Sequence, residues 1–366
     1  MPGRARSIAT AACASVTALM VSAAPALGAG PDYYVTPTAG LNFECTQAVP
    51  CSVETAASMA GSGDRILMAP GNYNMGFSMS LNAALMPQTP GTRPLLESPG
   101  GQTISVGGSA VIRDIRLVVS NMPTATYALN FSGGGRAERV EVFASNSGPS
   151  STPAAAAMNS GTVITDSVMV ADGDSAVAVF GGNEGGTIRN STLIATGANS
   201  VGFSASPSYM GPGVTTMTTT VQNSIVRGAA FGFSVFGDPT RTVIVNTDHS
   251  NYPAANNVGM TNAALNGTPQ TEDPLFSAAG SGDFHQLASS PTRNAGAAVP
   301  ALSATDLDGQ PRNQEGAPDI GADEFNVPAT PSTPGPPAKA KKCKKRKGKG
   351  RASPAKKKCK KPKKRR

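Results

Sequence analysis

The sequence predicts an all-β protein built as a right-handed parallel β-helix, and three observations favour this fold class. The chain has 366 residues with 41 Gly, 30 Pro, no Trp and 15% charged residues, which argues against a coiled coil or a highly charged disordered protein. A six-residue pattern recurs through the middle of the chain. Its spacing of roughly 25 residues is too short for a strand–helix–strand unit, which needs about 30. We therefore expect a solenoid of short strands.

Residues 1–29 have the features of a secretory signal peptide. Arg4 and Arg6 precede an apolar stretch from Ile8 to Ala24, and small residues follow up to Ala29. A transmembrane anchor is the alternative, but the stretch is rich in Ala, Ser and Thr and falls short of the ~20 strongly apolar residues of a membrane span. We expect export, with no transmembrane span in the mature chain.

The predicted body, residues 30–326, begins with a cap. Cys45 and Cys51 lie close together in a chain expected to enter an oxidising compartment, which indicates a local disulfide. Residues 52–60 carry apolar side chains at helical spacing, so we expect a short helix over the first coil. An exposed strand edge needs such a cover. An entry strand follows at residues 64–69.

The repeat itself occupies residues 112–249, with an apolar residue at its first position and, with one exception, at its sixth. On a straight strand this odd offset would place the two residues on opposite faces, so the strand is buried on both sides or bends between them. Asp, Asn and Ser at the third and fourth positions favour a bend. The third positions, spaced 25, 27, 24, 33 and 23 residues apart, are Asp114, Arg139, Asp166, Asn190, Asn223 and Asn246.

Stacking of the coils predicts that these corner residues form a column, at roughly 4.8 Å per coil. Arg139 would then lie between the carboxylates of Asp114 and Asp166, and three Asn would follow as a ladder. Because Arg139 separates the two carboxylates, no calcium cluster is predicted, and the body has no Lys to serve as a base. We interpret the column as structural and expect no metal site and no cofactor, with Ca²⁺ an unsupported alternative.

Both ends of the body resemble a known family. Tyr33-Tyr-Val35, the Cys45/Cys51 pair and residues 60–73 resemble the opening of secreted pectin-lyase-like β-helix proteins. Five C-terminal motifs resemble the choice-of-anchor Q module of bacterial surface proteins: Asp273-Pro-Leu-Phe276, Asp283-Phe-His-Gln-Leu287, Ser290-Pro291, Asp308-Gly-Gln-Pro-Arg312 and Asp319-Ile-Gly-Ala-Asp-Glu-Phe325. The resemblance implies an exported β-helix and places residues 306–309 in a C-terminal cap. It implies no enzyme activity, since this fold hosts lyases, hydrolases and binding proteins.

Two carboxylates are the catalytic candidates. Asp172 and Asp174 follow one strand of the repeat, and glycoside hydrolysis needs two carboxylates about 5–10 Å apart. A solvated turn is the interpretation that we favour. The two histidines, His249 and His285, lie 36 residues apart without a matching ligand spacing to any cysteine, so neither a zinc site nor a Ser/His/Asp triad is expected.

The amino-acid composition changes at the C-terminal end of the chain. Residues 327–338 are rich in Pro and predict an extended linker, and residues 339–366 carry 18 Lys and Arg without an aromatic, which predicts a disordered tail that binds polyanions by counterion release. The body carries eleven Arg against 23 Asp and Glu, a net charge of −12. The pairing of Cys343 and Cys359 stays open. The clustered tail residues expected to bind polyanions are Lys341, Lys342, Lys344, Lys345, Arg346, Lys356, Lys357, Lys358, Lys360, Lys361, Lys363, Lys364, Arg365 and Arg366.

These observations predict a non-catalytic protein of the extracellular cell surface. The tail would hold it on anionic cell-wall polymers, and the body would present a surface to a polysaccharide or another surface. A polysaccharide lyase or glycoside hydrolase of the pectin-lyase-like fold is the alternative. Binding of extracellular nucleic acid through the tail is a third, and an intracellular nucleic-acid role conflicts with the signal peptide.

Overall fold

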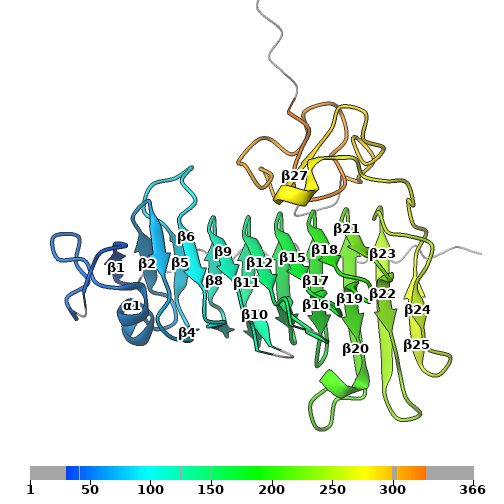
Figure 1. Cartoon of the computed structure of the whole chain (residues 1–366), viewed down its shortest axis with the longest axis horizontal. Helices are drawn as coiled ribbons and strands as arrows, with labels where there is room; N and C mark the ends of the chain where they lie inside the picture. The colour runs from blue at the N-terminus through cyan, green and yellow to red at the C-terminus, as the bar shows by residue number, and fades with distance from the viewer. Residues whose placement is uncertain (1–29, 41, 124–125, 149, 299–302, 327–366) are drawn as a thin grey trace, which may run out of the picture. The chain divides into compact units, whose positions relative to one another are not determined.

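Three parallel sheets wind around a common core (Figure 1). The computed structural model describes residues 30–326, apart from residues 41, 124–125, 149 and 299–302. Within each sheet the neighbouring strands are mostly three apart in the chain, because each turn of the chain contributes one strand to each sheet. This is a parallel β-helix, and the predicted fold class is confirmed. The expected signal peptide (1–29), linker (327–338) and basic tail (339–366) lie outside the described residues.

The strands of the three large sheets follow in spatial order. Sheet A contains β1 (Asp32–Val35), β2 (Arg65–Met68), β5 (Ala84–Pro87), β8 (Val111–Arg113), β11 (Arg136–Glu138), β14 (Thr162–Thr165), β17 (Gly186–Arg189), β20 (Thr216–Gln222), β23 (Thr242–Asp248) and β25 (Ala263–Asn266). Sheet B contains β3 (Asn72–Asn74), β6 (Leu95–Ser98), β9 (Arg116–Val119), β12 (Glu141–Ser145), β15 (Val168–Asp172), β18 (Thr192–Thr196) and β21 (Ile225–Gly228). Sheet C contains β4 (Met79–Leu81), β7 (Ile104–Gly107), β10 (Tyr127–Ser132), β13 (Ala154–Met158), β16 (Val177–Gly181), β19 (Val201–Ala205), β22 (Phe231–Val235) and β24 (Asn257–Val258).

The remaining elements are short. An antiparallel pair joins β26 (Phe276–Ala278) to β27 (Asp283–Gln286). The helices are α1 (Val53–Met59) and two 3₁₀ turns, η1 (Pro207–Tyr209) and η2 (Ala279–Ser281). Among the described residues, no helix has the length and apolarity needed to cross a bilayer.

A left-handed residue turns the chain from sheet A into sheet B in successive coils. A residue other than Gly adopts this conformation at a cost of about 1–2 kcal/mol, which Asn and Asp reduce by local hydrogen bonding. The bend brings the first and sixth residues of the repeat to the same interior. The φ angles are 53° at Asp114, 52° at Arg139, 51° at Asp166, 43° at Asn190, 46° at Asn223 and 41° at His249.

In the last of these coils the corner is His249 and not Asn246, which corrects the predicted column. Asn246 lies within β23, opposite Thr220, and accepts a hydrogen bond from the Asn266 amide. The repeat pattern has an apolar residue two positions before the corner, which is position 247 when the corner is His249. The structure places Thr247 there, buried, with its hydroxyl 2.9 Å from that of Tyr252. A hydrogen-bonded hydroxyl therefore replaces the apolar residue that the pattern demanded.

The interior is filled by aligned apolar columns. In sheet B the repeat supplies five fully buried residues in register, Leu117, Val142, Met169, Leu193 and Val226, and Leu96 continues the same column in the coil before them. Each such side chain contributes about 1.5–3 kcal/mol when removed from water. The repeat's sixth position supplies this column, so its periodicity reports the core of the β-helix.

The first coil is closed by the predicted cap. Ser52 caps the N-terminus of helix α1, and its hydroxyl accepts a hydrogen bond from the Thr55 backbone N–H at 3.2 Å. The Cys45–Cys51 disulfide is present, as predicted, and both cysteines are buried. The Tyr34 backbone N–H donates to the Cys45 carbonyl, and the Tyr34 carbonyl accepts from the Cys51 N–H. These two hydrogen bonds join the disulfide loop to β1.

The C-terminal segment, residues 273–326, packs on the outward face of sheet B. A second apolar cluster joins Val168, Val170, Ile194 and Ile225 of that face to Phe284, Leu307, Ile320 and Ala322 of the segment. Residues 306–309, expected in a cap of the helix end, lie instead near the early coils, where the Leu307 carbonyl accepts a hydrogen bond from Arg93. The sequence motifs could not show this, because the segment reverses onto coils far earlier in the chain.

The corner column anchors this segment. Arg312 is buried and its guanidinium lies 2.7 Å from Asp166 and 3.1 Å from Glu324. Burial raises the pKa of Glu324 to about 8, against the opposing effect of Arg312. The Asn223 amide oxygen accepts from the Ala297 N–H at 2.8 Å. Side chains predicted to stack only on one another thus also hold the C-terminal segment in place.

Candidate functional site

The outward face of sheet B presents side chains in rows, because alternate residues of parallel strands in register point the same way. One row is apolar, and its members are Val118, Phe143, Val170 and Ile194. The next row towards the strand ends is polar and contains Ser145, Asp172 and Thr196. The C-terminal segment covers the first row only partly, so the boundary between the two rows is accessible.

A groove of about 580 Å³ lies along this boundary, and we call it the Asp172 groove. Its volume falls in the range of small-molecule sites, about 300–1,000 Å³. It is lined on one side by sheet B and on the other by η2 and the start of β27. The lining residues are Arg116, Val118, Phe143, Ala144, Ser145, Val170, Asp172, Ile194, Thr196, Ala279, Gly280, Ser281, Gly282 and Phe284.

The polar groups of the groove are held by their neighbours. The Thr196 hydroxyl donates to the Asp172 carboxylate at 2.5 Å. The guanidinium of Arg116 lies over the Phe143 ring, 4.5 Å from its centroid, and 3.3 Å from Glu141. One wall therefore offers an aromatic ring and a cation, and the floor offers a carboxylate.

Gly282 shapes the opposite wall. Its φ of +80° is left-handed, and a Cβ there would lie 3.0 Å from the Phe143 ring. Only glycine combines this backbone conformation with so close an approach to the ring. The contact fixes the distance between η2 and the sheet, and hence the width of the groove.

The two catalytic candidates lie on a shared surface. Asp172 ends β15 and Asp174 follows in the turn, and both line a shallow hollow of about 540 Å³ on the far side of Asp172 from the apolar row. Asp174 accepts a long hydrogen bond, 3.4 Å, from the Asn199 amide. Asp172 thus belongs to two surfaces, and within the lining of the Asp172 groove it is the one carboxylate.

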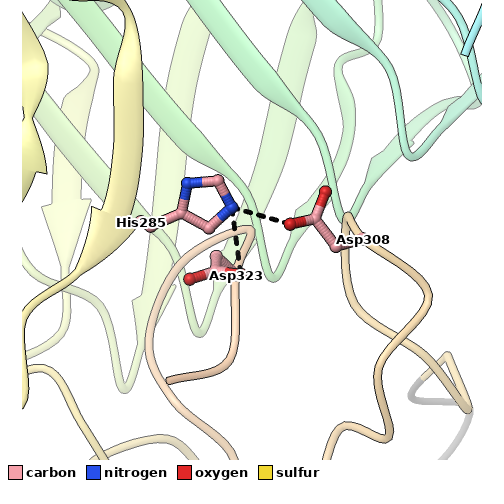
Figure 2. A group of neighbouring side chains, drawn as sticks. All are labelled: His285, Asp308 and Asp323. Atoms are coloured by element: carbon pink, nitrogen blue, oxygen red, sulfur yellow. Dashed lines mark hydrogen bonds and ion pairs between the residues drawn. The ribbon is translucent and has the colours of Figure 1, made fainter. Parts of the chain in front are cut away.

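A histidine–aspartate cluster lies next to the groove, because His285 directly follows the lining residue Phe284 in β27. The His285 ring donates through Nδ1 to Asp283. Its Nε2 lies 2.6 Å from Asp308 Oδ2 and 4.0 Å from Asp323 Oδ1 (Figure 2). The hydrogen bond to Asp308 is the main cause that raises the pKa of His285 to about 10. Burial raises the pKa of Asp323 to about 7.

The sequence identified neither the groove nor this cluster. His249 lies apart from His285, beside Asp248 at the edge of another cavity of about 550 Å³. Phe143, Phe284 and Arg116 were not predicted as lining residues. Apolar residues at both inward and outward positions of β15 and β18 were the available signal, since they indicate strands covered on both faces. The predicted polyanion-binding residues, Lys341 to Arg366, lie outside the described residues.

Comparisons with known proteins add little to this geometry. No protein-family model matches the chain, and no curated protein matches it. A solved structure, the crystal structure of pectate lyase Pel9A, superposes with a TM-score of 0.44 at 14% identity, covering 82% of this chain and 98% of that one. We draw no functional conclusion from so distant a likeness, and the fold assignment rests on the strand topology.

Proposed function

We propose that this protein is an exported, non-catalytic β-helix protein that binds a carbohydrate in the Asp172 groove and is held at the cell envelope by its basic tail. The groove carries the proposal. It combines an aromatic ring (Phe143), a carboxylate (Asp172) and hydroxyls (Ser145, Thr196), which suit a ligand with alternating apolar faces and hydroxyl groups. The buried disulfide supports an oxidising, extracellular setting.

The absence of a second carboxylate from the groove lining favours binding over cleavage. Glycoside hydrolysis needs an acid and a second carboxylate about 5–10 Å apart on the two sides of the scissile bond. Among the described residues that line the groove, Asp172 alone has a carboxyl group. A ligand there would meet a hydrogen-bond acceptor without a partner for acid–base chemistry.

The alternative is a polysaccharide lyase or glycoside hydrolase that uses Asp172 together with Asp174. One observation favours it, namely that both carboxylates line the same hollow. A substrate would then lie across the turns and not along the apolar row.

A glycan array combined with a lyase and hydrolase screen on the full secreted chain distinguishes these functions. We expect binding without turnover, weakened at least tenfold in Asp172→Asn, a loss of about 1.4 kcal/mol. Glu184→Gln removes an exposed carboxylate in a distant turn and should bind as the parent does. Turnover that disappears in both Asp172→Asn and Asp174→Asn, with folding intact, would replace the proposal by the alternative.

Attachment through residues 339–366 is the second part of the proposal. Eighteen cationic side chains without an aromatic suit an anionic polymer and not base stacking. We propose anionic wall polymers as the partner, because the signal sequence at residues 1–29 directs the chain out of the cytoplasm.

A further inference from the structure

The His285 cluster contains a carboxylate oxygen that no protein group satisfies. Asp323 is 4% exposed, and its Oδ1 has no hydrogen-bond partner. A buried carboxyl oxygen without a partner is unfavourable, since buried polar groups in proteins are hydrogen-bonded or coordinate metals. The cluster as it stands is therefore incomplete.

The His285 ring does not fill this gap. Both ring nitrogens carry a carboxylate partner, Asp283 on Nδ1 and Asp308 on Nε2. Each nitrogen has a single proton to donate. The Nε2 proton is directed to Asp308 at 2.6 Å, and Asp323 Oδ1 remains 4.0 Å away from the same nitrogen. Figure 2 shows the two carboxylates converging on that one atom.

We propose that His285, Asp308 and Asp323 bind one divalent first-row transition-metal ion, through Nε2 of the histidine and one oxygen of each carboxylate. The three ligand atoms lie within 4.8 Å of one another. A metal 2.0–2.2 Å from each ligand separates neighbouring ligand atoms by about 3–3.6 Å, so small side-chain rotations convert the cluster into a site. The ion would satisfy Asp323 Oδ1 and replace the Nε2 proton.

The donor set selects the class of ion. An imidazole nitrogen with two carboxylate oxygens suits Zn²⁺ or Mn²⁺, whereas Ca²⁺ takes six to eight oxygen ligands. Asp283 would act as a positioning residue, because a carboxylate on the second ring nitrogen fixes the tautomer of a metal-bound histidine. The three ligands come from β27 and from the loops around Asp308 and Asp323, so the ion would join three parts of the C-terminal segment.

Zinc binding to the full secreted chain tests the proposal, independently of any carbohydrate. Cys343→Ser and Cys359→Ser are present in every sample, because their thiolates would bind zinc themselves. After stripping with a chelator, loading with Zn²⁺ and gel filtration, elemental analysis should find about one zinc per chain in the parent and less than about a tenth in Asp323→Asn and His285→Ala. His249→Ala removes the other His–Asp pair and should keep the full content.

Two further variants keep the result decisive. Asp308→Asn removes a ligand at the surface, so it replaces Asp323→Asn if that buried variant does not fold by circular dichroism. Asp283→Asn should still load fully at saturating zinc but bind about 10–100-fold more weakly. Equal zinc in the parent and His285→Ala, or none in the parent, would overturn the proposal and leave an imidazolium paired with carboxylates.

Discussion

Arg312 is the residue on which the attachment of the C-terminal segment most depends. Its guanidinium donates to Asp166 across 146 residues of chain and to three backbone carbonyls, those of Asn190, Gly321 and Ala322. Its five donors in a planar fork suit this set of acceptors, which a lysine could not satisfy. The side chain of Arg312 thereby joins the corner column to the backbone at Gly321 and Ala322, near the end of the body.

Replacing Arg312 by Met tests this role. Removing one partner of a buried ion pair leaves Asp166 and Glu324 as uncompensated buried carboxyls, so we expect the free energy of unfolding to fall by about 3–5 kcal/mol. Urea unfolding followed by circular dichroism measures it. Arg65→Gln is the control, since Arg65 pairs with Asp32 at a position that is only partly buried. If the two variants lose similar stability, the anchoring role is wrong.

At the scale of the element, the coil could be predicted because residues close together in the sequence determine where the chain bends. Turn residues at a fixed offset from apolar residues gave the corners at Asp114, Arg139, Asp166, Asn190 and Asn223, all of which are left-handed. The register failed only in the last repeat, where Thr247 occupies an inward position. A better signal follows the corner: buried serines occur there in four successive coils, at Ser167, Ser191, Ser224 and Ser250.

These serines form a ladder that links the coils. Each hydroxyl donates to the backbone carbonyl two residues earlier, and each of the last three accepts from the backbone N–H of the preceding coil's serine. Ser191→Ala would leave the buried Ser167 N–H without its acceptor. We expect a loss of about 1–3 kcal/mol in the free energy of unfolding, measured by denaturant titration. Ser62→Ala, an exposed hydroxyl, should change it by less than about 0.5 kcal/mol.

The first coil gives a second prediction at this scale. The Cys45–Cys51 disulfide closes a loop of six residues' separation, for which the chain-entropy account gives about 2 kcal/mol. In the Cys45→Ser/Cys51→Ser variant we expect a lower melting temperature and faster amide exchange in β1, which the loop contacts through Tyr34. Exchange in β15 should rise less, because it lies several coils away. Uniformly faster exchange would show that the disulfide acts on global unfolding alone.

At the scale of the whole molecule, the candidate site could not be predicted, because it forms between parts of the chain that are far apart in sequence. Phe143 and Gly282 meet across 139 positions, and no local periodicity encodes such a contact. Charge segregation, by contrast, needs only counting. The body has a net charge of −12 and the tail carries 18 cationic side chains. We therefore expect ligand binding by the body and by the tail to depend differently on salt concentration.

The dependence of binding on salt concentration distinguishes the attachment of the tail to an anionic polymer from glycan binding in the Asp172 groove. Each tail cation that neutralises a polymer charge releases a counterion, so with 6–10 such contacts the affinity for an anionic polymer should fall about 10³–10⁵-fold between 50 and 200 mM salt. Binding to immobilised wall polymer, measured over this range, should become weak and nearly salt-independent when residues 339–366 are replaced by an uncharged tail of equal length. Glycan binding in the Asp172 groove should stay unchanged in the same variant. In a competition assay at equal charge concentration, displacement of the protein from wall polymer by nucleic acid would favour nucleic acid as the partner of the tail. Retention on the wall polymer would support attachment to the cell envelope.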